Sequence, residues 1–65
     1  MPWTSKQYPP SMKNLMAPVR KKAVEIANAL LYEGMEEGRA IATATKKAEE
    51  WAEKRGKKIK KDAAS

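Results

Sequence analysis

Three neighbouring glutamates, Glu49, Glu50 and Glu53, are of a type that could bind a metal ion. Carboxylate oxygens are ligands for hard cations such as Ca²⁺ and Mg²⁺, but these cations need several convergent oxygens. On a helix, Glu49 and Glu53 share a face while Glu50 points elsewhere, and nearby lysines stand at pairing distance. We therefore expect no metal site here. The expectation is a solvated ion-pair face that includes Lys46, Lys47 and Lys54.

Catalytic and phosphate-loop chemistry lacks its necessary partners in this sequence. The chain contains no His and no Cys, so no imidazole is present to activate the Ser and Thr hydroxyls. Gly34 and Gly38 have a GxxxG spacing outside any long apolar segment, and Gly56-Lys57 lacks the strand and the Ser or Thr of a phosphate loop. We interpret these glycines as turn and cap residues. The chain is predicted not to be an enzyme and to hold no cofactor.

The basic residues are the remaining candidates for a functional site. The 65-residue chain has a net charge of +6, and residues 54–65 carry +5 of it, against +1 for residues 1–53. A lysine run of this kind is most often solvated and mobile, so any contact with nucleic acid or an anionic surface is expected to be weak. No aromatic residue is interleaved with the run, and we expect no stacking on bases. The candidate contacts are Lys54, Arg55, Lys57, Lys58, Lys60 and Lys61.

Two helices are predicted to position these residues. Pro18 suits the first turn of a helix and Gly34 suits a left-handed C-terminal cap, so the first helix is predicted over about 18–33. The second is predicted over about 37–55, with Gly56 as its stop. The short connection makes the helices antiparallel neighbours. The predicted fold is therefore an all-α helical hairpin.

Alanines are predicted to line the faces that the two helices share, and larger apolar residues to fill the space at the ends. The first helix carries an apolar arc wide enough to touch two neighbours, with Asn28 on its polar side. Alanines recur at every fourth position of the second helix, which lets the two backbones approach closely. The predicted core consists of Trp3, Val19, Ile26, Leu30, Ile41, Ala44, Ala48 and Trp51.

The N-terminal segment is expected to cover the part of the first helix that the second leaves exposed. Pro9-Pro10 favours a short helix over about 10–15, and Ala17, which precedes Pro18, is expected to be extended. Trp3 is predicted to plug the surface of the first helix. The other apolar side chains available for this cover are Tyr8, Met12, Leu15 and Met16.

Residues 1–52 also carry a resemblance to known small bacterial proteins. The opening Met1-Pro2-Trp3, the stretch Tyr8-Pro9-Pro10-Ser11-Met12-Lys13-Asn14-Leu15 and the helix with Glu25-Ile26-Ala27-Asn28-Ala29-Leu30-Leu31 resemble the ChaB-like cation transport regulators. The segment from Glu37-Gly38-Arg39-Ala40-Ile41-Ala42 through Trp51 is similar to small bacterial and phage proteins with a helix, a glycine turn and a helix. The resemblance implies regulation through contact with a partner and carries over no catalytic residue.

The sequence thus predicts one helical domain over 1–55, followed by a disordered lysine-rich tail over 56–65. Its predicted function is that of a small non-catalytic binding or regulatory module with a protein partner. The alternative is a nonspecific nucleic-acid-associated protein that acts through the tail. No apolar stretch approaches the roughly 20 residues that span a bilayer, and we expect a cytoplasmic monomer or homodimer.

Overall fold

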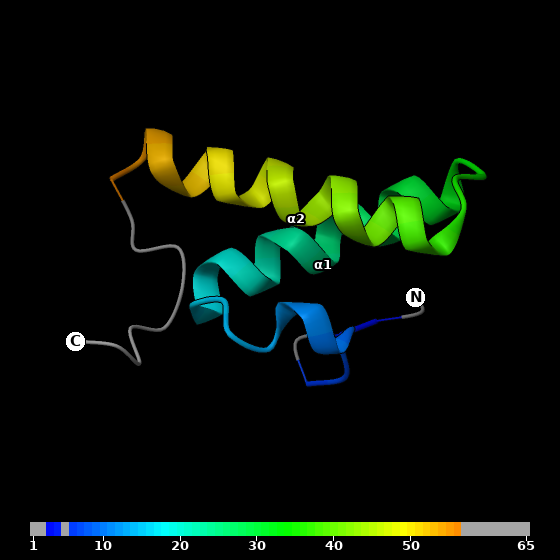
Figure 1. Ribbon diagram of the computed structural model, residues 1–65, viewed down its shortest axis with the longest axis horizontal. Coiled ribbons are helices and arrows are strands. Elements are labelled where there is room, and N and C mark those ends of the chain that lie inside the picture. The colour runs from blue at the N-terminus through cyan, green and yellow to red at the C-terminus, as the bar shows by residue number, and fades with distance from the viewer. Residues whose placement is uncertain (1–2, 5, 57–65) are drawn as a thin grey trace.

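The structure is a computed structural model that describes residues 3–4 and 6–56. The 3-10 helix η1 spans Pro10–Met12, the helix α1 spans Ala17–Tyr32 and the helix α2 spans Glu37–Lys54. The two long helices run antiparallel and pack against each other, and the N-terminal segment lies against α1 (Figure 1). The predicted all-α helical hairpin is confirmed. The limits of α1 and α2 differ by no more than one residue from the predicted ones.

The turn between the helices depends on a glycine. Gly34 has a φ of 99°, in the left-handed region that residues with a Cβ rarely adopt. Its N–H donates to the Leu31 carbonyl at 3.0 Å, and the Met35 N–H donates to the Leu30 carbonyl at 3.0 Å. This is the Schellman arrangement, which satisfies carbonyls at the end of a helix. Gly56, with a φ of 67°, follows the end of α2, so both predicted cap glycines are confirmed.

The start of α1 lies one residue earlier than predicted. Met16 is the extended residue before the helix, with φ −62° and ψ 150°, and the prediction of an extended Ala17 is wrong. Pro18 occupies the second helical position instead of the first. Its missing N–H carries no penalty there, because the first four N–H groups of a helix have no partner within the helix.

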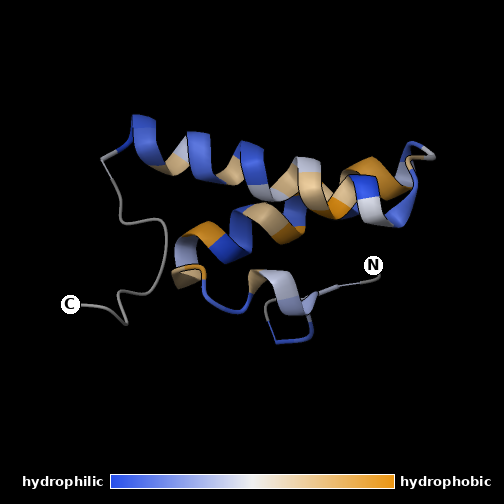
Figure 2. Cartoon of the chain, in the orientation of Figure 1, coloured by the Kyte–Doolittle hydropathy of each residue, from blue (hydrophilic) through white to orange (hydrophobic). Residues whose placement is uncertain are grey.

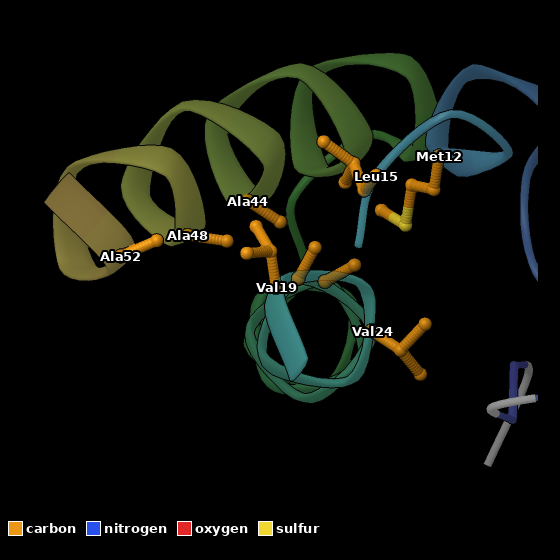
Figure 3. Packing of buried hydrophobic residues seen from close by; sticks show 9 residues of the cluster. Met12, Leu15, Val19, Val24, Ala44, Ala48 and Ala52 are labelled. Carbon is orange, nitrogen blue, oxygen red and sulfur yellow. The ribbon is translucent and has the colours of Figure 1, made fainter. Parts of the chain in front are cut away.

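The interface between α1 and α2 is built on alanines. Ala23 and Ala27 of α1 are fully buried, and Figure 3 shows Val19 of α1 facing the alanines of α2. Short side chains at these positions let the backbones approach closely, while the larger Leu30, Ile41 and Trp51 pack around the buried cluster. The predicted alanine seam is confirmed. Its members on α2, each fully buried, are Ala40, Ala44, Ala48 and Ala52.

The N-terminal segment completes the core beside the hairpin. Met12 and Leu15 are 0 % and 1 % exposed and belong to the same buried cluster as the helix residues (Figure 3). The helix predicted over 10–15 is too long, because η1 ends at Met12. The Arg20 side chain hydrogen-bonds the carbonyl oxygens of Met12, Lys13 and Leu15, which lie at and beyond the end of η1.

Asn28 is buried, contrary to its prediction as a surface residue. It is 6 % exposed, and its side-chain amide pairs with the backbone of Trp3. The Trp3 N–H donates to Asn28 Oδ1 at 3.2 Å, and Asn28 Nδ2 donates to the Trp3 carbonyl at 3.0 Å. A helical wheel places Asn on the exposed side because the residue is polar. In the structure its amide instead supplies the acceptor and the donor that the N–H and the carbonyl of Trp3 need. Trp3 packs against the core, as predicted.

Polar residues cover the outer side of α2, and apolar residues line its contact with α1 (Figure 2). This separation is the pattern of a surface helix that buries one face. The lysine-rich tail predicted over 56–65 lies, apart from Gly56, outside the described residues. The domain boundary between residues 55 and 56 stays a prediction.

Candidate functional site

The hairpin brings two basic segments that are distant in sequence to one end of the molecule. Arg20, Lys21 and Lys22 lie in the first two turns of α1, and Lys54 and Arg55 stand where α2 ends. Because the helices are antiparallel and similar in length, the start of α1 and the end of α2 lie at the same end (Figure 1). We call these five residues the basic end.

The other end of the hairpin has the opposite charge. Residues 33–39, which contain the turn, carry three glutamates and one arginine, whereas residues 17–23 carry three basic and no acidic side chains. Glu53 precedes Lys54 in the sequence, and its negative charge offsets part of the positive charge of the basic end. The hairpin is therefore charged unevenly along its length, and a polyanion would be attracted to the basic end.

Trp51 joins the two segments of the basic end. The Lys22 Nζ atom lies 5.6 Å from the centre of the Trp51 ring, and the Arg55 Cζ atom lies 5.2 Å from it. The ring is half-buried and packs against the core cluster. Both distances are within the range of a cation–π interaction. No aromatic residue is interleaved with the basic run itself, but Arg55 follows Trp51 by four residues and so lies beside it on the helix, and the fold adds Lys22.

Arg20 has a different role from its neighbours in the basic end. Its Nη2 donates to the Leu15 carbonyl at 3.0 Å and to the Lys13 carbonyl at 3.5 Å, and its Nε donates to the Met12 carbonyl at 3.4 Å. Its guanidinium also lies 4.6 Å from the centre of the Tyr8 ring. Arg20 therefore fastens the N-terminal segment to α1, and its charge is directed toward the chain's own carbonyls.

The residues predicted as core belong to the observed packing cluster. Val19, Ala44 and Ala48 are fully buried. The remaining members are partly buried and pack against them: Trp3, Ile26, Leu30, Ile41 and Trp51. Met12 is also fully buried but was not among the predicted core residues. It was expected only as part of the N-terminal cover.

The residues predicted to contact anions fall into two groups. Lys54 and Arg55 are exposed and lie in the basic end. Lys57, Lys58, Lys60 and Lys61 lie outside the described residues. Sequence reasoning missed the run Arg20-Lys21-Lys22, whose three consecutive basic residues were a visible signal once the start of one helix was placed beside the end of the other.

An open groove lies between η1 and the N-terminal half of α2. The Thr45 hydroxyl donates to the Ile41 carbonyl at 2.8 Å, so it is engaged within its own helix. The lining combines small, aliphatic and charged residues. Its lining residues are Ser11, Gly38, Ile41, Ala42, Thr45, Lys46 and Glu49.

Neither a metal-binding cluster nor a membrane-spanning helix occurs in the part of the chain that the structure describes. Residues 3–4 and 6–56 contain no group of three or more acidic, His or Cys side chains placed to hold a metal ion, and Glu49, Glu50 and Glu53 do not form one. Within the same residues, no helix has both the length and the apolar character that crossing a membrane requires.

Comparison with known proteins gives one informative relative. The chain is 68 % identical over 53 residues, which is 82 % of its length, to "Uncharacterized protein YdaT" of Bacillus subtilis (strain 168). The match covers 35 % of that protein, so the chain spans about a third of the length of the curated relative it matches. No protein-family model matches the chain. No solved structure matches it.

Proposed function

We propose that this chain is a small non-catalytic binding module that uses its basic end to hold a negatively charged partner. The observation that carries the proposal is the gathering of Lys21, Lys22, Lys54 and Arg55 at one end of the hairpin, next to the exposed part of Trp51. Basic side chains on one surface attract polyanions over a distance set by the Debye length, about 8 Å at physiological salt.

A polyanion accounts for this surface better than an apolar ligand does. Lys54 and Arg55, where α2 ends, are followed in the sequence by Lys57, Lys58, Lys60 and Lys61. Each basic side chain that neutralises a phosphate releases a counterion, so the affinity falls steeply with salt concentration. Nonspecific contact with nucleic acid through these lysines is therefore the second candidate function. It has the same electrostatic origin.

The resemblance to ChaB-like cation transport regulators supports a regulatory setting for such a contact. In that setting the module acts by contact alone, which agrees with a chain that contains no His and no Cys. The relative with which the chain aligns is about three times longer than the matched segment, and we propose that the module works there as one part of a larger protein.

The proposed function is tested by the salt concentration at which the full chain elutes from immobilised heparin. Neutralising two residues of the basic end, in K21Q/K22Q, should lower this concentration clearly. A matched variant, R39Q/K46Q, removes the same amount of charge from exposed residues nearer the turn and should lower it less. Equal shifts in the two variants would show that net charge alone decides binding, and failure of the full chain to bind at low salt would refute the proposal.

The second candidate is tested by truncation. The full chain and residues 1–55 are titrated with labelled duplex and single-stranded DNA at a low and a high salt concentration. Loss of salt-sensitive binding on truncation would assign the contact to the lysines after residue 55. Retained binding would assign it to the basic end, since all five of its residues remain.

A further inference from the structure

We infer that Trp51 is a stacking platform for the unpaired bases of a single-stranded nucleic acid, with Lys22 and Arg55 holding the adjacent phosphates. This inference rests on the proposed function and names the class of polyanion that the basic end takes. It goes beyond charge, because a purely electrostatic contact has no use for an aromatic ring.

The position of Trp51 fits such a platform. One part of the ring packs against the core cluster, which fixes its orientation, and the ring as a whole is only half-buried. The cationic groups of Lys22 and Arg55 lie over the ring, 5.6 and 5.2 Å from its centre, where a base would stack. A fixed ring with flanking cations is the combination by which proteins hold single strands.

A base can replace a cation on this ring at little cost. Stacking of a base on an aromatic side chain is generally stronger than a cation–π contact at an exposed site. Arg55 is exposed and ends α2, and the structure gives the side chains of Lys22 and Arg55 no hydrogen bond within residues 3–4 and 6–56. A side chain displaced by the base remains close enough to pair with the neighbouring phosphate.

Tyr8 and Arg20 form a second aromatic–cation pair that does not have these properties. The guanidinium of Arg20 is 4.6 Å from the Tyr8 ring centre and is also held by the carbonyls of Met12 and Leu15. Displacing it would break these hydrogen bonds between α1 and the N-terminal segment. Trp51, whose cations are not tied in this way, is therefore the better platform.

Other polyanionic partners use this surface less completely. The bases of a duplex are paired inside it and cannot stack on Trp51. The two long helices of the hairpin lie side by side, so neither helix is free to enter a groove as a recognition helix does. A membrane surface would need exposed apolar side chains to insert, and the large hydrophobic residue exposed in the described part of the chain is Tyr32, at the opposite end of α1. An acidic peptide would engage the cations and leave the ring unused.

The test uses the full-length chain carrying W3F, in which Trp51 is the single tryptophan. Its fluorescence is followed while oligothymidylate, a DNA duplex, heparin or vesicles containing phosphatidylserine are added at low salt. We expect quenching by oligothymidylate and binding without comparable quenching by heparin and the duplex. In the otherwise unchanged chain, W51L should weaken oligothymidylate binding by about 5- to 100-fold, with heparin binding retained. W51F should keep most of the affinity, because its ring can still stack.

Controls separate this inference from the proposed function. Y32L changes an exposed aromatic residue at the far end of α1 and should leave all affinities unchanged. If W51L fails to fold, as judged by circular dichroism, the quenching in the W3F chain still decides. Binding of every polyanion without Trp51 quenching, or quenching by vesicles alone, would overturn the inference and leave the proposed function standing. Absence of binding to any polyanion would refute both.

Discussion

The reciprocal pair between Asn28 and Trp3 offers the sharpest test of how this small fold is held together. The substitution N28A removes the side-chain amide and leaves the N–H and the carbonyl of Trp3 without the partners seen in the structure. Both atoms belong to the backbone of a segment 25 residues away in sequence. The substitution should therefore loosen the attachment of the N-terminal segment to α1.

The size of the effect follows from two hydrogen bonds and one change in helix propensity. Each neutral hydrogen bond contributes about 0.5–1.5 kcal/mol to stability, so the two together contribute about 1–3 kcal/mol. Alanine favours a helix over asparagine by roughly 0.5 kcal/mol, which offsets part of this loss. We expect a net loss of about 1–2 kcal/mol, a large share of the roughly 3–5 kcal/mol that a core of this size supplies. For so small a domain this lowers the Tm by roughly 5–15 °C.

The exchange variant N28A/A29N is the matched control for helix propensity. Ala29 is exposed and adjacent to Asn28, so the exchange keeps the composition and the propensity of α1 while it removes the contact with Trp3. It should lose the full contribution of the two hydrogen bonds, about 1–3 kcal/mol. Thermal and urea unfolding monitored by circular dichroism measure both variants. A melting curve of the exchange variant that matches the wild type would refute the role assigned to Asn28.

The variant N28D adds a dependence on pH with a defined sign. A protonated carboxyl can accept from the Trp3 N–H and donate to the Trp3 carbonyl, whereas the buried carboxylate can only accept. Burial therefore raises the pKa of this introduced carboxyl in the folded state above its unfolded value of about 3.9. The N28D protein therefore keeps its stability relative to wild type at a pH below the unfolded pKa. It loses this stability as the pH rises through the raised pKa of the folded state. A loss of stability in N28D that does not change with pH would contradict the pairing of residue 28 with the Trp3 backbone.

Three further substitutions test the remaining elements of the fold by thermal unfolding. A44L should overpack the fully buried seam and lower the free energy of unfolding by about 1–3 kcal/mol. A42L, at an exposed position of the same helix, should change it by no more than about 0.5 kcal/mol. Equal effects of the two variants would show that the seam is misplaced. G34A should lower the stability by about 1 kcal/mol or more, because Gly34 has a φ of 99°. G38A, inside α2, should raise the stability by up to about 1 kcal/mol. A stabilising G34A and a destabilising G38A would contradict the cap assigned to Gly34. R20K keeps the charge but cannot reach three carbonyls in a fork, and should cost about 1 kcal/mol; an unchanged Tm would show that the fork contributes little.

The parts of the fold that were predictable from sequence are those that depend on local chemistry. Gly34 stops α1 because its backbone needs a left-handed φ, and the fourfold spacing of the alanines selects one face of α2. Both properties belong to a few consecutive residues. The hydrogen bonds of Arg20 to the carbonyls of Met12 and Leu15 were less predictable, because they join α1 to the segment that precedes it and depend on how that segment folds back.

The two helices, their order, their antiparallel pairing and the alanine face between them were predictable from the sequence, because helix caps and apolar periodicity are local signals. The burial of Asn28 against Trp3 and the position of Lys22 over the Trp51 ring depend instead on the tertiary fold. These two contacts join residues that are 25 and 29 positions apart, and no periodicity within one helix encodes them. The candidate site therefore arises where the start of one helix meets the end of the other.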